Sequence, residues 1–282
     1  MRELFSVFAA AAMLLACAAP AVVLGSAEGT SAAVSEGVYL DARAKTAFME
    51  EKNAQMGEDF SLSPEERDEV QQLMAAATLA KTEEEATACL QQLASYGVFA
   101  FAGEPVTPSE NQASSGADVT LAVPMVFYSV HYHEWTVTCG GRWNGDGWTE
   151  GVGLFSADVG EPEGFGVEFT DVGEDYDSYV RSTVAYLTDA LGERETRTTN
   201  RADGNGKYGF AFQLQDRIYQ TTVDGLRKNQ YIGYAWYGAC TYDSHFAGCS
   251  GTAIGYYVHT YGAIEADILP AFPVETDGIS VA

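Results

Sequence analysis

Apolar side chains recur at every second position from residue 119 onward, and this alternation constrains the fold more than any other feature of the sequence. Val119, Leu121 and Val123 begin a series that returns in the same phase as far as Cys139. A repeat of two is that of a strand with one buried face, because successive side chains of a strand point to opposite sides. The series is longer than an ordinary strand, so we expect a bend near residues 129–133.

Glycine-rich turns divide the rest of this region into further strands. Residues 144–147 read Asn-Gly-Asp-Gly, which tolerate the positive φ angles of tight turns, so they predict a hairpin tip. One apolar stripe at helical spacing, from Tyr176 to Leu191, predicts a helix that ends at Gly192. We expect strands at 151–157, 164–171, 207–215, 217–223, 230–241 and 252–262. Their spacing favours an antiparallel sandwich or an irregular barrel.

The stretch 41–96 has the period of amphipathic helices instead. The run Ser63–Glu66 combines a capping hydroxyl, a proline at the first helical position and a glutamate that reaches back to the cap, which predicts a helix start. Thr82 predicts a second start, and Gly97 is placed to end that helix. A weaker pattern predicts a further helix from Asp41 to Met56. The whole chain is therefore expected to be mostly β, with an N-terminal helical hairpin, and α+β in overall class.

The first residues of the chain have the order of a secretory signal. A charged start is followed by an apolar run from Leu4 to Gly25 and then by small and polar residues. Small Gly25 and Ala27 suit cleavage after Ala27, which predicts a signal peptide at 1–27. Two alternatives stay open: the motif ending in Cys17 resembles the lipobox of bacterial lipoproteins, in which the cysteine is acylated, and the apolar run is long enough to remain as an uncut membrane anchor. In each case we expect an exported protein, either secreted or attached to the cell surface.

Residue composition changes near position 118. Of the 16 Tyr, 14 lie after it, as do all four Trp and 22 of the 29 Gly, so the aromatic core belongs to the C-terminal part. Residues 103–118 carry too little apolar area to offset the entropy of ordering them, which is typical of a linker. The predicted organisation is a signal at 1–27, a helical segment at 28–102, this linker, and a β-rich domain at 119–282.

The net charge limits the partners. The formal charge is −25 at pH 7, from 40 acidic and 15 basic residues. Such a field repels phosphate backbones and anionic lipid, so we expect no nucleic acid partner and membrane contact only through the N-terminal segment. The turn at 202–207 lacks the ligand series and closing glutamate of an EF-hand, so it predicts no calcium site.

Four cysteines follow Cys17, and an even number in an exported chain favours disulfides. Cys240 and Cys249 enclose a short loop, and they are the preferred pair. The competing choice pairs Cys139 with one of these two on an adjacent strand and leaves Cys89 as an inert thiol. No CxxC spacing occurs, so the sequence supports neither redox catalysis nor a structural zinc site.

Two histidines are candidates for metal binding. On an extended strand His131 and His133 project to the same side, a geometry that zinc sites use, and Glu134, His245 or His259 reaches them only through folding. No zinc signature surrounds the pair. The competing interpretation is that both histidines are hydrogen-bonded at the edge of the core.

Ser250 is a candidate nucleophile because it lies between small residues in the run 248–251, Gly-Cys-Ser-Gly. His131 or His133 precedes it in the order that trypsin-like proteases use. The match is poor, because Cys249 stands where that family has aspartate and no nucleophile elbow is present. A triad of Asp243, Ser244 and His245 is weaker still, since neighbours in sequence rarely converge.

Aromatic residues on the late strands are the most unusual feature. Trp236 and Tyr234 share one face of the run 231–238, whereas Tyr231 and Tyr237 occupy the other, and Tyr257 follows on the last strand. We take Tyr231, Tyr237, Trp236 and Tyr257 as candidates for a ligand-facing surface, because Tyr and Trp suit the binding of glycans and protein surfaces. The competing interpretation is that both faces of these strands are covered, as in the middle of a sandwich.

These observations predict an exported binding protein without catalysis that contacts an extracellular glycan or protein surface. No cofactor is expected for that role. One alternative is a secreted hydrolase, either metal-dependent through Zn²⁺ at His131 and His133 or serine-type near Ser250. Another is a bacteriocin-like exported toxin whose helical segment is a pro-region.

Overall fold

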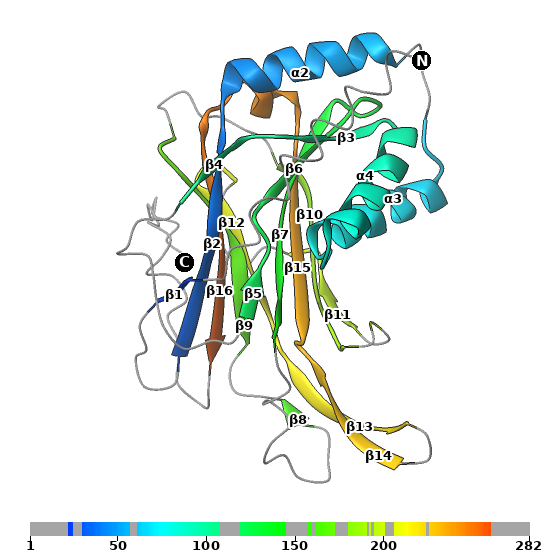
Figure 1. Cartoon of the computed structure of the whole chain (residues 1–282), viewed down its shortest axis with the longest axis vertical. Coiled ribbons are helices and arrows are strands. Elements are labelled where there is room, and N and C mark those ends of the chain that lie inside the picture. The colour runs from blue at the N-terminus through cyan, green and yellow to red at the C-terminus, as the bar shows by residue number, and fades with distance from the viewer. Residues whose placement is uncertain are drawn as a thin grey trace, which may run out of the picture.

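The computed structural model describes residues 22–24, 30–56, 61–107, 119–144, 157–158, 162–172, 180–190, 192, 195–200, 206–223 and 226–260. Within these ranges the chain is mostly strand, with three antiparallel sheets and three α-helices (Figure 1). The two larger sheets pack face to face and neither closes into a barrel. The predicted class, mostly β with an N-terminal helical hairpin and α+β overall, is confirmed.

The first sheet has the strand order β1-β2-β16-β9-β12, and β4 pairs with the same edge of β2 as β1 does. Its strands are β1 (Val22–Leu24), β2 (Thr30–Leu40), β16 (Gly251–Thr260), β9 (Glu163–Thr170), β12 (Gly209–Leu214) and β4 (Glu104–Val106). The strands at 164–171, 207–215 and 252–262 were thus predicted close to their observed bounds. The rest of the predicted signal and most of the linker, residues 108–118, lie outside the described residues.

Strand β2 lies inside the segment 28–102 that the sequence predicted to be helical, and that part of the prediction is wrong. Ala33 and Val34 point to opposite faces and are both fully buried, so the strand shows no alternation of apolar and polar residues. It pairs with β16 from Thr30 to Leu40, which satisfies its backbone groups. Residues from the two ends of the described chain therefore share one sheet.

The second sheet has the order β11-β10-β15-β7-β6-β3, and β5 pairs with β7. Its strands are β11 (Glu195–Thr198), β10 (Val180–Thr188), β15 (Ala235–Tyr242), β7 (Glu134–Trp143), β6 (Met125–Ser129), β3 (Val98–Phe101) and β5 (Val119–Leu121). The bend expected near 129–133 is confirmed, because a turn joins β6 to β7 there.

Two local predictions for this sheet are wrong. The described part of the expected helix 176–191 is strand β10, which is hydrogen-bonded to β15 on one side and β11 on the other. Its Val and Thr residues favour strands, and pairing on both edges outweighs a weak helical stripe. The expected strand 230–241 is two strands, because Gly233 turns the chain with φ 142° between Ile232 and Ala235.

A third, smaller sheet extends from one end of the sandwich, at the bottom of Figure 1. It consists of β8 (Ala157–Asp158), β13 (Arg217–Val223) and β14 (Leu226–Ile232) in the order β14-β13-β8. An exposed ion pair between Arg217 and Asp158, at 2.7 Å, joins β13 to β8. The strand predicted at 217–223 is confirmed, whereas most of the one predicted at 151–157 lies outside the described residues.

The helices are α2 (Ala42–Gln55), α3 (Pro64–Thr78) and α4 (Glu83–Ser95). The predicted caps are present: Ser63 and Glu66 form a capping box, and the Thr82 side chain accepts from Glu85 N. Helices α3 and α4 form the predicted hairpin and cover part of the outer face of the second sheet, whereas α2 crosses one end of the sandwich (Figure 1). No helix in the described ranges has the length and apolar character needed to cross a membrane.

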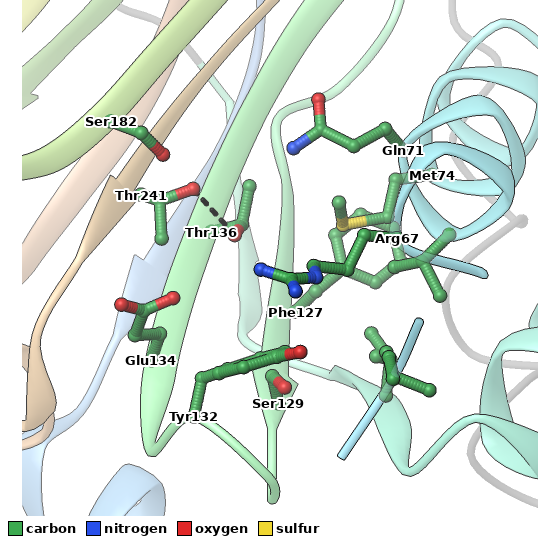
Figure 2. A pocket seen from close by; sticks show the side chains of 13 residues that line it. Arg67, Gln71, Met74, Phe127, Ser129, Tyr132, Glu134, Thr136, Ser182 and Thr241 are labelled. Atoms are coloured by element: carbon green, nitrogen blue, oxygen red, sulfur yellow. Dashed lines mark hydrogen bonds between the residues drawn. The ribbon is translucent and has the colours of Figure 1, made fainter. Parts of the chain in front are cut away.

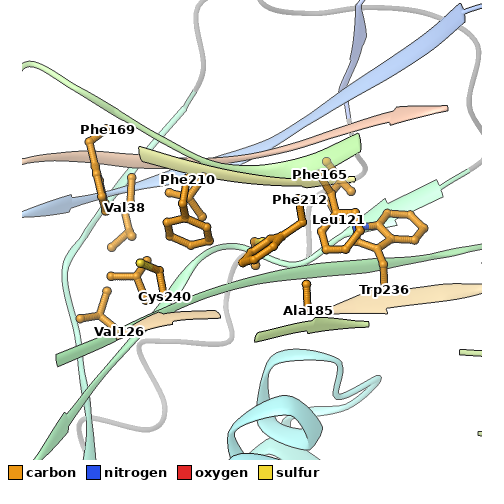
Figure 3. Packing of buried hydrophobic residues seen from close by; sticks show 14 of the residues in the cluster. Val38, Leu121, Val126, Phe165, Phe169, Ala185, Phe210, Phe212, Trp236 and Cys240 are labelled. Atoms are coloured by element: carbon orange, nitrogen blue, oxygen red, sulfur yellow. The ribbon is translucent and has the colours of Figure 1, made fainter. Parts of the chain in front are cut away.

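The main core lies between the two large sheets, as Figure 3 shows. Phe165, Phe210 and Phe212 extend from the first sheet toward Trp236 and Cys240 of the second. A smaller core joins α3 and α4 to the opposite face of the second sheet, where the buried hydroxyls of Thr78 and Thr138 lie 2.8 Å apart. The second sheet is thus buried on both faces over part of its area.

Candidate functional site

A groove lies between α3 and the part of the second sheet that the helices leave open. The capping box fixes where α3 begins, and the helical repeat then places Arg67, Val70, Gln71 and Met74 along the side that faces the sheet. Arg67 and Gln71 are four residues apart, as are Val70 and Met74, so the polar pair and the apolar pair each line one part of the groove.

The floor of the groove is a row of hydroxyl groups across three strands. Strand register places Ser182 of β10 beside Thr241 of β15, and Thr241 beside Thr136 of β7. The hydroxyls of Thr136 and Thr241 are 3.0 Å apart, and Figure 2 shows the three side chains pointing to the same side of the sheet. Each hydroxyl both donates and accepts, so this row offers hydrogen bonds of either direction to a ligand.

Tyr132 and Glu134 form one end of the groove, at the turn that leads into β7. The guanidinium of Arg67 lies 5.8 Å from the centre of the Tyr132 ring and points into the groove (Figure 2). Within the described ranges no carboxylate forms an ion pair with Arg67. Partial burial raises the pKa of Glu134 and nearby Asp243 acts in the same direction, whereas Arg181 opposes them.

The groove has a volume of about 290 Å³ and continues into a second hollow of about 270 Å³. Arg67, Gln71, Ser182 and Thr241 line both, so the two hollows are continuous. The second hollow reaches Arg197 on β11. Apolar residues complete the first: Leu62, Val70, Met74, Val98 and Phe127. An open, partly polar groove of this size is suited to a small or extended ligand.

The sequence did not predict these groove residues. Thr136 and Ser182 are ordinary residues of strands, and they come together only through the register of β7, β15 and β10. The alternation of β7 indicated which side chains share a face, but no local pattern indicates which strands are neighbours. Tyr132 lies within the turn that the sequence did predict, and Glu134 follows it as the first residue of β7.

The predicted aromatic surface is wrong. Tyr231, Tyr237, Trp236 and Tyr257 are each at most 1% exposed. Trp236 and Tyr257 stack across the core with ring centres 3.8 Å apart and planes at 11°, and Tyr237 lies under α3 beside Ala75. The first sheet covers one face of β15 and the helices cover the other. The competing interpretation, in which both faces of these strands are covered, is therefore the correct one.

His131 and His133 lie in the turn between β6 and β7 rather than on a strand. His133 has a positive φ of 51° and its Nδ1 is 3.1 Å from the Tyr128 hydroxyl. Half-buried His131 lies against Gly97, where an added Cβ would be 2.5 Å from its Nε2. Neither histidine belongs to a group of potential metal ligands among the described residues. Both histidines lie at the bend expected near residues 129–133, so the extended-strand geometry assumed for the pair does not apply.

The residues proposed for nucleophilic catalysis have local structural roles. The Ser250 hydroxyl accepts a hydrogen bond from Ala42 N at 2.9 Å, at the start of α2. His245 Nδ1 lies 3.0 Å from Asp243 Oδ1, and Asp243 also accepts from His245 N at the start of the short helix η3 (Ser244–Gly248). The described hydrogen bonds therefore connect Ser250 with a helix end instead of a histidine.

No disulfide joins the described cysteines, Cys89, Cys139, Cys240 and Cys249. Cys240 and Cys249 are both buried, and the Cys249 thiol donates to His245 O at 3.4 Å. The preferred pairing of these two in an oxidising space stays a prediction. Cys17, the lipidation candidate, lies outside the described residues.

A second group of polar residues is buried far from the groove, at the end of the sandwich where β13 and β14 leave it. Glu163, Asp216 and His259 lie there together, and the phenol of Tyr231 donates to Asp216 Oδ2 at 2.6 Å. Burial raises the pKa of Glu163 to about 8, and burial together with Glu163 does the same for Asp216. Burial lowers the pKa of His259 to about 4.

Comparison with protein-family models, with curated proteins and with solved structures found no match. A function for this chain can therefore be inferred only from the geometry of the groove and of the buried polar group.

Proposed function

We propose that this chain is an exported binding protein that holds a neutral, hydroxyl-rich extracellular glycan in the groove between α3 and the second sheet. Export is expected from the charge and hydropathy order of the N-terminal segment. The observation that carries the proposal is the row of Ser182, Thr241 and Thr136 hydroxyls facing the Arg67 guanidinium. No step of catalysis is needed for this role.

The polar groups of the groove match those of a sugar. Arg67 offers several N–H donors in one plane, Glu134 is an acceptor, and the row of hydroxyls and Gln71 serve in both directions. Each hydroxyl group of a sugar both donates and accepts, and one planar side chain with several polar atoms can hydrogen-bond two adjacent hydroxyls. Apolar Val70 and Met74 of α3, across the groove from the row of hydroxyls, suit the C–H faces of the same sugar rings.

Tyr132 adds an aromatic ring, which suits the binding of amphipathic ligands such as sugars. Its side chain is 36% exposed and stands at the end of the groove, where its ring can support the apolar face of a sugar. The strongly negative net charge argues against polyanionic glycans, because like charges repel at long range. A neutral oligosaccharide avoids that repulsion.

The test is a screen of the full mature chain against an array of neutral oligosaccharides, followed by calorimetric titration of each binder. Removal of a side chain that contacts the bound sugar directly is expected to weaken binding tenfold or more, which corresponds to about 1.4 kcal/mol. Arg67→Ala and Tyr132→Ala should each have this effect. An array with no binder, or binders whose affinity neither substitution changes, contradicts the proposal.

The chain provides a matched control for these two substitutions. Lys207 lies 5.0 Å from the ring centre of Tyr208, which is 38% exposed, so this pair repeats the cation and tyrosine arrangement away from the groove. Lys207→Ala and Tyr208→Ala should leave glycan affinity unchanged. Equal losses in both pairs would indicate general contact of sugars with exposed tyrosines, and would reject the groove as the site.

A further inference from the structure

Three side chains with metal-binding atoms meet inside the end of the sandwich. Glu163 begins β9, Asp216 lies between β12 and β13, and His259 is near the end of β16. One potential ligand atom from each lies within 4.8 Å of the other two. Glu163 and Asp216 are fully buried and His259 is 5% exposed, so the three groups face one another and not solvent.

Polar atoms at this place remain unsatisfied by the protein. Glu163 Oε2 is buried and forms no hydrogen bond within the described ranges, although Glu163 Oε1 contacts His259 Nδ1. Fully buried Tyr257 is close enough to the Glu163 carboxylate to affect its pKa, but its hydroxyl falls outside the geometry of a regular hydrogen bond. A buried oxygen with no protein partner requires an explanation, and a bound ion is one that also accounts for the neighbouring ligand atoms.

The electrostatic balance of the site is also compatible with a bound cation. Two carboxyl groups are buried together, and among the described residues no Lys or Arg pairs with either of them. Arg217 follows Asp216 in the chain but pairs with Asp158 at the surface. Two buried negative charges are very unfavourable unless protons or a cation neutralise them, and one divalent ion beside a neutral imidazole gives a net charge of zero.

We propose that Glu163, Asp216 and His259 bind one divalent transition-metal ion of the kind that accepts mixed nitrogen and oxygen ligands, such as Zn²⁺. Imidazole nitrogen distinguishes this class from Ca²⁺ and Mg²⁺, which take oxygen ligands. The site does not involve His131 or His133, and it does not depend on what the groove binds. Its role is to hold together β9, β16 and the segment that joins β12 to β13.

Residues around the three ligands orient them. The Tyr231 hydroxyl donates to Asp216 Oδ2 at 2.6 Å, and Gln215 Nε2 lies 3.3 Å from Asp216 Oδ1, so both oxygens of this carboxyl group have fixed directions. The Trp143 ring meets the His259 ring edge to face at 5.0 Å. Such contacts outside the ligand set hold the donors at the geometry that a metal requires.

The direct test is titration of the chelator-treated full chain with ZnCl₂, followed by calorimetry and thermal unfolding. One equivalent is expected to bind, and a concentration of 100 times the Kd should raise the Tm by about 5–10 °C. CaCl₂ and MgCl₂ at the same concentration should leave the Tm unchanged. Co²⁺ in place of Zn²⁺ should give the visible absorption bands of a protein-bound Co²⁺ ion with a low coordination number.

Variants locate the ion. Glu163→Gln, Asp216→Asn and His259→Gln should each weaken Zn²⁺ binding at least tenfold, whereas the double variant His131→Ala/His133→Ala should bind as the wild type does. Failure of one variant to fold leaves the other two and the wild-type titration as tests. The proposal is overturned if the wild type binds no Zn²⁺, if Ca²⁺ binds equally well, or if binding follows His131 and His133.

Discussion

The ammonium group of Lys45 donates a hydrogen bond to the backbone carbonyl of Phe246 at 2.6 Å and lies 3.8 Å from the centre of the Phe246 ring. This contact joins α2 to η3 across the end of the sandwich. Lys45 is fully buried, and burial lowers its pKa from 10.5 to about 7, against smaller opposing effects of Cys249 and Asp41. The charged form is therefore disfavoured in the folded chain.

The sign of the resulting pH dependence follows from proton binding. Between pH 7 and 10.5 the unfolded chain keeps a proton on Lys45 that the folded chain has lost, so the free energy of unfolding contributed by this residue rises with pH across that window. Below pH 7 both states hold the proton, and the full penalty of burying the charge applies.

Lys45→Met is expected to remove this dependence. The stability of the wild type relative to the variant should increase by a few kcal/mol between pH 6.5 and pH 10. Urea unfolding of both proteins at a series of pH values measures the difference, and other titrating groups largely cancel in it. A difference that does not vary with pH would contradict the burial of a titrating ammonium group.

Gly166→Ala is expected to destabilise the first sheet by about 1–3 kcal/mol. A Cβ at Gly166 would lie 2.0 Å from the carbonyl oxygen of Phe210 on β12, so β9 and β12 must move apart. Gly248→Ala is the control, because a Cβ there meets nothing within 4 Å and the cost should stay within about 0.5 kcal/mol. Chemical unfolding distinguishes the two, and equal costs would argue against the register of β9 with β12.

The contact of α3 with the second sheet is expected to depend on the hydrogen bond between Thr78 and Thr138. Thr78→Val and Thr138→Val should be less destabilising together than the sum of the single changes, with a coupling of about 0.5–1.5 kcal/mol. Thr78 and Thr252, a buried threonine on β16 of the first sheet, serve as the uncoupled pair for comparison. Additivity of the Thr78 and Thr138 substitutions would mean that α3 does not dock as described.

Local signals in the sequence predicted those elements whose cause is local. The capping residues Ser63 and Thr82 predicted α3 and α4, because a cap acts on backbone groups within one turn. The alternation of apolar residues after Val119 predicted β6 and β7, because successive side chains of one strand point to opposite faces. Strand β2 was missed, because a strand buried on both faces loses the alternation that identifies it.

The errors at the candidate sites have a different cause. The burial of Trp236 and Tyr257 depends on the partner sheet, and the meeting of Glu163 with His259 depends on strands that are almost a hundred residues apart in sequence. Neither relation has a local pattern. His259 was a candidate ligand only through folding, and the fold brings it to Glu163 and Asp216 instead of to His131.

Chemical-shift mapping of the bound glycan on the ¹⁵N-labelled mature chain tests the central claim most directly. Titration with the tightest neutral oligosaccharide from the array should shift the backbone amides of Arg67, Gln71, Ser182 and Thr241, since these residues line both hollows of the groove. Amides near Tyr208 should stay unchanged. Shifts confined to another surface, or no shift at saturating oligosaccharide, would show that this groove does not bind a glycan.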